Sequence, residues 1–218
     1  MRRGRDRARQ GATARSPLDF RDCWYALGLT RMATDEARIH LLARVARGGD
    51  VSPEKPASIL SLCAAAYGAR PQDEATVPTG FDPHAVALFE TIVEGAYLVA
   101  KADGQFDDAE RKAFERVVVS ACGGTVTPKQ IGGLVADLQD QLDEDGVDQR
   151  ILRLAAAVPK KEHAIEVLRI AALLADASEG VSPVEREMLG KIAAGCKLEA
   201  SEVDRAIADV RAALSGTI

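Results

Sequence analysis

The sequence predicts an all-α fold, a helical bundle built from a duplicated unit of helix, acidic turn, helix and helix, with extra N-terminal helices. Three observations support this prediction. Apolar residues recur at the spacing of one helix face, and strand-like runs rich in Val, Thr, Tyr and Phe are absent. Aromatic residues make up only 4% of the chain, so small aliphatic side chains must fill the core. Two carboxylate-rich turns, at residues 101–110 and 175–185, each lie between helical patterns.

The chain begins with a basic stretch. Residues 1–15 include six arginines, and a tail rich in Arg, Gly and Ala is typically disordered. Residues 1–81 carry 13 basic and 9 acidic residues, a net charge of +4, and residues 82–218 carry 15 and 24, a net charge of −9. No aromatic residues interleave with the arginines of the tail. We therefore expect no specific nucleic-acid partner, and only weak electrostatic contact of the tail with anionic surfaces.

Helical patterns follow the tail. Apolar residues recur at i, i+3, i+4 and i+7 from Ile39 to Ala46, and Gly48 ends the pattern. The stretch before Asp82 contains two prolines and a glycine but few apolar residues, which is typical of a linker. The chain therefore divides into a disordered basic tail (1–15), an N-terminal helical segment (16–68), a linker (69–81) and a helical domain (82–218).

The predicted domain opens with a long helix. Asp82 and Pro83 suit its start, because Asp caps a helix and Pro fits the first turn. The apolar stripe over residues 83–100 is wide, which places this helix near the middle of the bundle. After the first acidic turn, Asp107 can cap a second helix that ends at Gly123.

The third helix of the unit begins at Thr127 and ends in an acidic run before Gly146. A connecting helix then stops at Pro159, which lacks the N–H group that a helix needs. An Ala-rich and Leu-rich helix over residues 160–175, the second acidic turn, a helix that begins at Ser182 and a last helix complete the second unit.

The two units align around the helix that follows each acidic turn. Glu110 matches Glu185 at the start of this helix, and Phe114 matches Leu189 on its apolar face. Internal duplication is the simplest account of this agreement.

The repeated turn suggests a family. An Ala-Asp-Gly turn, then Ser or Asp and a helix-opening Glu, twice in an all-α chain, resembles the tellurite-resistance TerB family and the related N-terminal domain of DjlA-type co-chaperones. The resemblance covers about residues 82–215. It implies a compact helical domain with a divalent cation at the acidic turns and a role in stress response or protein interaction. The metal ligands that it implies are Asp103, Asp107, Glu110, Asp176, Glu179 and Glu185.

Two interpretations of the acidic turns stay open. Ca²⁺ or Mg²⁺ would need oxygen ligands from both turns, because a single turn does not follow the EF-hand order. Asp103 follows a helix, where the dipole disfavours a carboxylate and a cation would compensate. Alternatively, Asp107-x-x-Glu110 and Ser182-x-x-Glu185 are capping boxes, and Arg111, Arg186 or Lys101 neutralises the remaining acids. The second turn also departs from the family pattern, since Asp-Ala-Ser-Glu-Gly replaces Asp-Gly.

The sequence contains no catalytic signature. Gly-rich phosphate loops, G-x-S-x-G and H-E-x-x-H are absent, and the three histidines and four cysteines lack zinc-site spacing. We therefore predict a non-enzymatic module that binds an unidentified protein partner, gated by the cation. A metal-free interaction scaffold is the first alternative, and a hydrolase with a carboxylate-bound metal is the second. With no signal peptide and no long apolar stretch, we expect a cytoplasmic location.

Overall fold

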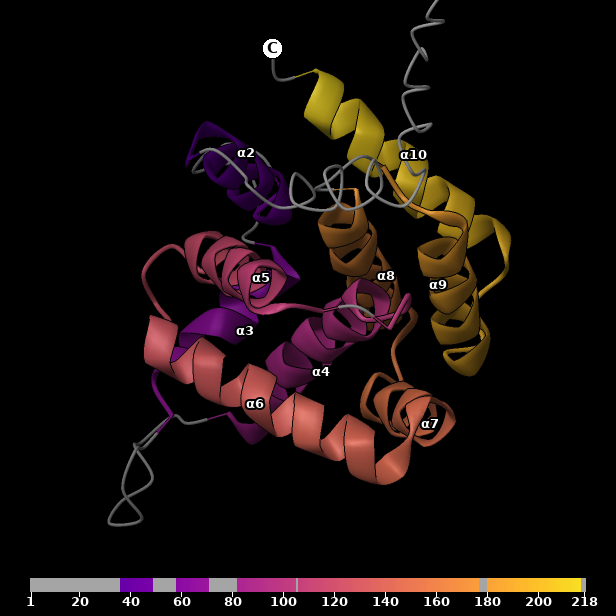
Figure 1. Ribbon diagram of the computed structural model, residues 1–218, viewed down its shortest axis with the longest axis horizontal. Helices are drawn as coiled ribbons and strands as arrows, with labels where there is room; N and C mark the ends of the chain where they lie inside the picture. The colour runs from indigo at the N-terminus through magenta and orange to yellow at the C-terminus, as the bar shows by residue number, and fades with distance from the viewer. Residues whose placement is uncertain (1–35, 49–57, 71–81, 105, 177–179, 217–218) are drawn as a thin grey trace, which may run out of the picture. The chain divides into compact units, whose positions relative to one another are not determined.

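The computed structural model describes residues 36–48, 58–70, 82–104, 106–176 and 180–216. These residues form α-helices joined by turns, and none of them lies in a β-strand, which confirms the predicted all-α fold (Figure 1). The helices are α2 (Glu36–Ala46), α3 (Ile59–Gly68), α4 (Pro83–Ala100), α5 (Asp108–Ala121), α6 (Pro128–Asp145), α7 (Val147–Ala157), α8 (Lys161–Ala175), α9 (Pro183–Gly195) and α10 (Ser201–Ser215).

The centre of the bundle is the pair α4 and α8 (Figure 1). Of the 18 residues of α4, 12 are buried, as the wide apolar stripe predicts, and α8 buries 10 of its 15 residues. The two helices approach closely at Gly95, where an added Cβ atom would lie 2.4 Å from Cγ1 of Val167. Glycine is therefore required at this crossing, despite its cost in a helix interior.

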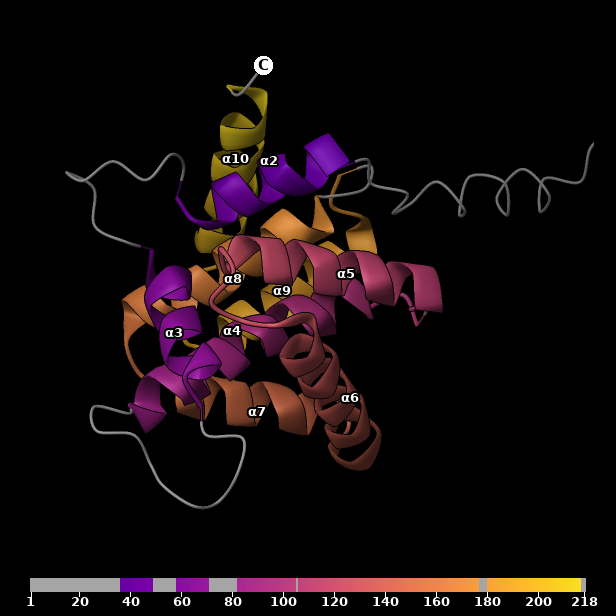
Figure 2. The same ribbon diagram turned by 90° about the vertical axis from the view of Figure 1, so that its left-hand side faces the viewer.

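The helix order reproduces the predicted duplication. The helices α4, α5 and α6 form the first unit, and α8, α9 and α10 form the second. Between them, α7 packs against α4, α6 and α9. Each unit contributes its first helix to the central pair and places the other two around it (Figure 2).

The two helices that precede the first unit share its core. The helix α3 packs on α4, and α2 packs on α5, α8 and α10. Leu42 and Leu60 belong to the same buried cluster as Phe89. The described residues between 36 and 216 accordingly belong to one compact unit. The predicted tail (1–15), residues 16–35 of the N-terminal segment and residues 71–81 of the linker lie outside the described residues.

Several helix ends follow from local sequence. Oδ1 of Asp82 accepts hydrogen bonds from the N–H groups of His84 and Ala85, at 2.9 and 3.2 Å, and so caps α4 as predicted. At the other end of the unit, Gly146 ends α6 with a φ of 76°, a backbone conformation that favours glycine.

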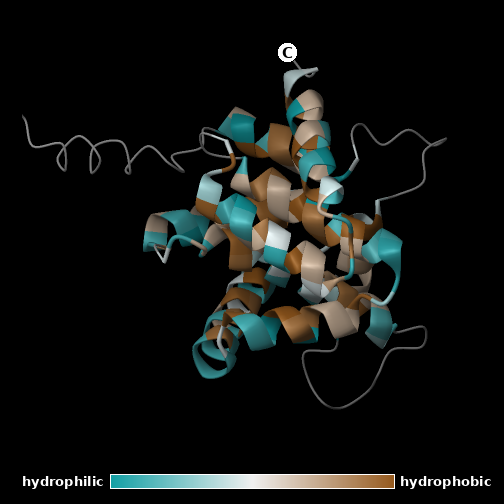
Figure 3. Ribbon diagram, turned by 90° about the vertical axis from the view of Figure 1, so that its right-hand side faces the viewer, coloured by the Kyte–Doolittle hydropathy of each residue, from teal (hydrophilic) through white to brown (hydrophobic). Residues whose placement is uncertain are grey.

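The hydropathy of the helices follows the burial of their residues. Hydrophobic segments concentrate in the interior, and hydrophilic ones at the outer turns (Figure 3). Among the described helices, none is both long and apolar enough to cross a membrane. Every buried side-chain nitrogen and oxygen of the described residues has a hydrogen-bond partner.

Candidate functional site

The first acidic turn connects α4 to α5. Asp107 caps α5, because its Oδ1 accepts hydrogen bonds from the N–H groups of Ala109 and Glu110, both at 2.8 Å. In return, Oε2 of Glu110 accepts a hydrogen bond from the N–H group of Asp107 at 3.2 Å. Two of the predicted metal ligands thus form a capping box. Asp103 is exposed and stands before Gly104, whose φ of 79° turns the chain.

The second acidic turn ends in an equivalent capping box at the start of α9. The N–H group of Glu185 donates to Oγ of Ser182 at 3.3 Å, and the N–H group of Ser182 donates to Oε2 of Glu185 at 2.8 Å. Glu185 is only 5% exposed, so its carboxylate is held more deeply than that of Glu110. The local pattern Ser-Pro-x-Glu is sufficient to explain this arrangement.

Asp176 follows α8 and meets two arginines. Its Oδ1 accepts a hydrogen bond from Nε of Arg211, on α10, at 3.2 Å. Its carbonyl oxygen accepts one from Nη2 of Arg38, on α2, at 3.5 Å. Positive charge from two other helices therefore offsets the unfavourable position of this carboxylate at a helix C-terminus.

The described parts of the two turns contact different helices. In the first turn, Lys101 hydrogen-bonds to Gln139 of α6, and Phe106 packs edge-on against Tyr97 with ring centroids 5.4 Å apart. The second turn instead faces α10 and α2. No three His, Cys, Asp or Glu side chains of the described residues are grouped so that they could hold a metal ion. Glu179 lies outside these residues, and the shared cation site stays a prediction.

Sequence reasoning missed two glutamate–arginine pairs, each with a buried glutamate. The first pair joins α4 to α7, where Nε of Arg150 donates to Oε1 of Glu94 at 2.7 Å. Nη1 of Arg150 also donates to Oδ2 of Asp145 at 3.1 Å, so the pair also contacts the C-terminal end of α6. Both side chains of the pair are 8% exposed. Burial raises the pKa of Glu94, and the hydrogen bond and charge of Arg150 only partly oppose this effect.

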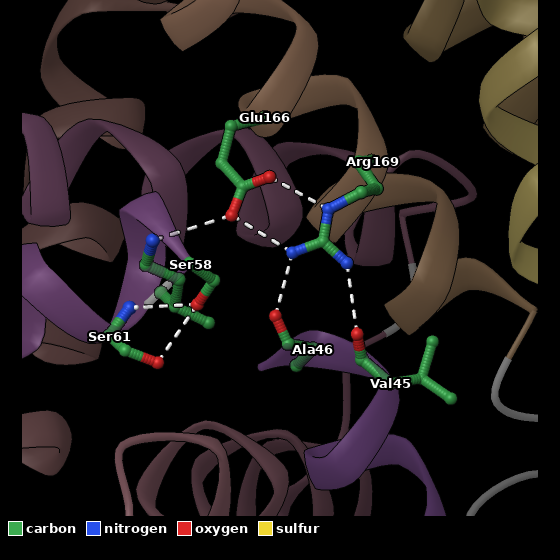
Figure 4. A network of polar contacts seen from close by, with 7 residues as sticks. Val45, Ala46, Ser58, Ser61, Glu166 and Arg169 are labelled. Carbon is green, nitrogen blue, oxygen red and sulfur yellow. Dashed lines mark hydrogen bonds and ion pairs between the residues drawn. The ribbon is translucent and has the colours of Figure 1, made fainter. Parts of the chain in front are cut away.

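The second pair joins α8 to α2 and α3 (Figure 4). Nε and Nη2 of Arg169 donate to the two carboxylate oxygens of Glu166 at 2.7 and 2.9 Å. Arg169 also donates to the carbonyl oxygens of Val45 and Ala46, at the C-terminal end of α2, at 3.0 and 2.6 Å. The N–H group of Leu60, near the start of α3, donates to Oε1 of Glu166 at 3.3 Å. A charged pair spaced i, i+3 within the apolar part of α8 was the sequence signal for this network.

Comparison with protein-family models matches residues 90–208, more than half of the chain, to the family described as tellurite resistance protein TerB. The chain belongs to the TerB family. This match confirms the resemblance to the TerB family that the acidic turns suggest. Comparison with curated proteins gave no match, and comparison with solved structures gave none.

The TerB segment, residues 90–208, runs from α4 into α10. It contains both acidic turns and both glutamate–arginine pairs, whereas α2 and α3 lie outside it. The first pair therefore connects TerB helices to one another. The second pair connects the TerB segment to the helices that this chain adds before it.

The described cysteines of this TerB-family chain belong to its packing. Burial raises the pKa of Cys63 to about 11 and that of Cys122 to about 12, so neither is a thiolate at neutral pH. Cys196 is partly exposed, and burial raises its pKa as well. Cys23 lies outside the described residues.

Proposed function

We propose that this TerB-family chain is a non-enzymatic helical module that acts by binding a protein partner. The observation that carries the proposal is that the acidic side chains of the two turns already cap helices or pair with an arginine. Asp107, Glu110 and Glu185 cap helices, and Asp176 pairs with Arg211. Acids used in this way stabilise the helical scaffold itself. This supports the proposal that the function lies in a surface of the scaffold that binds a partner.

A cation at the acidic turns would compete with these bonds. Ca²⁺ takes six to eight oxygen ligands, so a site built from these acids would draw on Glu110 and Glu185, which already accept hydrogen bonds at helix ends. Loss of a helix cap typically costs about 0.5–2 kcal/mol. The metal-free scaffold is therefore the form of the proposal that the geometry supports best, and the cation-gated module is its rival.

The family description supports one extension. Because the matched family is described by tellurite resistance, we propose that partner binding serves a stress response of this kind. Expression of the chain in a tellurite-sensitive host should then raise survival on tellurite. Equal survival with an empty vector would count against this extension.

Thermal unfolding separates the scaffold from its rival. Chelator-treated protein should keep its unfolding midpoint when titrated with Ca²⁺, Mg²⁺, Mn²⁺ or Zn²⁺. A bound cation would instead stabilise the native state by about 2.7 kcal/mol at a hundredfold excess over its dissociation constant. A rise in the midpoint that Asp103→Asn removes would contradict the metal-free proposal, and Asp148→Asn, an exposed acid of α7, is the matched control.

Partner binding itself is tested by capture with the full chain. The proposal expects one protein to be retained equally in chelator and in Ca²⁺, because binding does not depend on a cation. Loss of the partner in chelator would favour the cation-gated module. Turnover of a generic phosphoester panel by the purified protein would contradict the non-enzymatic proposal.

A further inference from the structure

We infer that the face formed by α5, α8 and α10 is a binding groove for an amphipathic helix, and that α2 occupies it in this chain. This inference rests on the proposed function, because it names the surface and the class of partner through which the module acts. The helix α2 packs on all three helices, and Figure 2 shows it above α5 and beside α10. The TerB segment supplies α5, α8 and the first half of α10, but not α2.

The helix α2 has the properties of a docked ligand. It is 11 residues long, and an isolated helix shorter than roughly 12–15 residues is marginal in water. Its conformation therefore depends on the surface that it contacts. Its buried side chains are small or aliphatic and share one face; they are Ile39, Leu42, Ala43, Val45 and Ala46.

Charged groups at both ends of α2 suit the helix dipole. Glu36, in the first turn, pairs with Arg116 of α5. At the opposite end, the guanidinium of Arg169 binds the carbonyl oxygens of Val45 and Ala46 (Figure 4). An acid near the N-terminus and a cation at the C-terminus both stabilise a helix.

The pair of Arg169 and Glu166 is a main-chain clamp. Because the contacts of Arg169 with α2 go to carbonyl oxygens, it recognises the end of a helix without reading its sequence. Glu166 orients the guanidinium through two bonds, and both residues belong to α8. The clamp is therefore built entirely within the TerB segment. A helix from another protein could satisfy it as α2 does.

A small cavity lies beside the C-terminal end of α2, where α5 and α8 meet α3 and α4. A cavity of about 10 Å³, roughly the size of one water molecule, lies between Ala46, Leu60, Val117 and Ile170 and is lined by apolar side chains. The fitting partner is thus an amphipathic helix of about three turns with an acid in its first turn. It would end at Arg169, and a side chain slightly larger than alanine at the place of Ala46 would fill the cavity.

The test uses the full chain and a fluorescent peptide of residues 36–48 as the probe. In the Leu42→Lys chain, α2 can no longer bury residue 42, so the groove opens. The peptide should then bind at least roughly tenfold more tightly to this chain than to the wild type, measured by fluorescence anisotropy. Adding Arg169→Gln should weaken binding by a similar factor. Arg205→Gln, which alters an arginine of α10 with a 73% exposed side chain, should leave binding unchanged.

Circular dichroism and cooperative thermal unfolding establish whether each variant is folded. If Leu42→Lys unfolds the chain, Leu42→Ala takes its place with the same expected order of affinities. If neither substitution leaves a folded chain, α2 is an integral part of the core and the inference is overturned. A folded, opened chain that does not bind the peptide, or binds it equally well with Arg169→Gln, overturns it too.

Failure of the groove is distinguishable from failure of the proposed function. One outcome is that the Leu42→Lys and Arg169→Gln chains capture the same partner as well as the wild type does. That result would overturn the inferred groove but not the proposal that the protein binds a partner. A wild-type chain that captures no protein would instead count against the proposed function.

Discussion

The central helices α4 and α8 each bury one glutamate and pair it with an arginine, but the two pairs face different parts of the molecule. Glu94 and Arg150 connect α4 to α7, two helices of the TerB family segment. Glu166 and Arg169 lie together on α8 and bind main-chain groups of α2 and α3, which precede that segment.

This difference separates a structural role from a recognition role. An ion pair between side chains of two helices fixes one packing, and its loss leaves a charge buried without a partner. A guanidinium that binds carbonyl oxygens at a helix end accepts any helix that ends there. Removing the first pair should therefore damage the whole bundle, whereas removing the second should release α2.

The largest effect is expected from Arg150→Met. It leaves Glu94 buried without its positive partner and leaves Asp145 with Arg153, so the free energy of unfolding should fall by about 3–5 kcal/mol. Urea unfolding at pH 7 measures the loss. The double variant Glu94→Gln with Arg150→Met should recover part of it, because the uncompensated charge is removed. A loss below about 1 kcal/mol would contradict the structural role.

The same variant should respond to pH. Burial raises the pKa of Glu94 in the folded state. A carboxyl group whose folded pKa exceeds its unfolded pKa contributes stability that is full below the unfolded pKa and is lost as pH rises through the folded pKa. Without Arg150 this effect should grow, so Arg150→Met should be closer to wild-type stability at pH 5 than at pH 7. Urea unfolding at the two pH values would show it, and an equal deficit would contradict the assignment.

A smaller effect is expected from Arg169→Gln. The substitution removes bonds to two carbonyl oxygens and to the carboxylate of Glu166, which keeps only the N–H group of Leu60 among these partners. Hydrogen bonds to charged groups contribute about 1.5–3 kcal/mol each, and release of α2 limits the total loss. Urea unfolding should therefore give a loss below that of Arg150→Met. A loss equal to it would remove the distinction between the two pairs.

Thiol alkylation should distinguish the two pairs further. Burial raises the pKa of the Cys63 thiol, on α3, to about 11, and the charge of Glu166 also raises it. Alkylation at pH 8 should be slow in the wild type. It should be faster after Arg169→Gln, because lost bonds at Glu166 and α2 allow local opening, which outweighs the effect of the Glu166 charge. Cys122, whose pKa burial raises to about 12, should change less and serves as the internal control. Mass spectrometry of digested protein gives both rates, and an equal increase at both cysteines would indicate global opening.

The smallest effects are expected at the acidic turns. Asp107→Ala and Ser182→Ala each remove one side of a capping box, which should cost about 1 kcal/mol. The loss should be the same in chelator and in Ca²⁺. Thermal unfolding with and without the cation measures both quantities. A loss of stability that appears only in Ca²⁺ would indicate that these residues bind a cation.

Much of the fold could be predicted from local sequence. Pro and capping residues set the starts of α4, α6 and α9, and the wide apolar stripe of α4 placed it at the centre. The capping boxes at Asp107 and Ser182 were predicted as well, because both partners lie within four residues of each other. The periodicity over Ile39–Ala46 likewise predicted α2, whose described bounds agree with it.

The two glutamate–arginine pairs could not be predicted in the same way. Glu94 and Arg150 are 56 residues apart, and Arg169 binds carbonyl oxygens more than 120 residues away. Main-chain groups carry no sequence signal, so the contact of Arg169 with α2 depends on the tertiary fold. For the same reason, the sequence did not predict that Arg211 and Arg38 bind Asp176.

Hydrogen exchange of the full chain, followed by mass spectrometry, tests the central distinction most directly. Amide groups of α2 should exchange through a local opening, at least roughly tenfold faster than those of α4 and α8. Arg169→Gln should accelerate exchange in α2 and leave α4 and α8 unchanged, whereas Arg150→Met should accelerate all three helices. If α2 exchanged at the rate of α4 and α8 in every variant, it would belong to the same cooperative core, and the recognition role of Arg169 would be wrong.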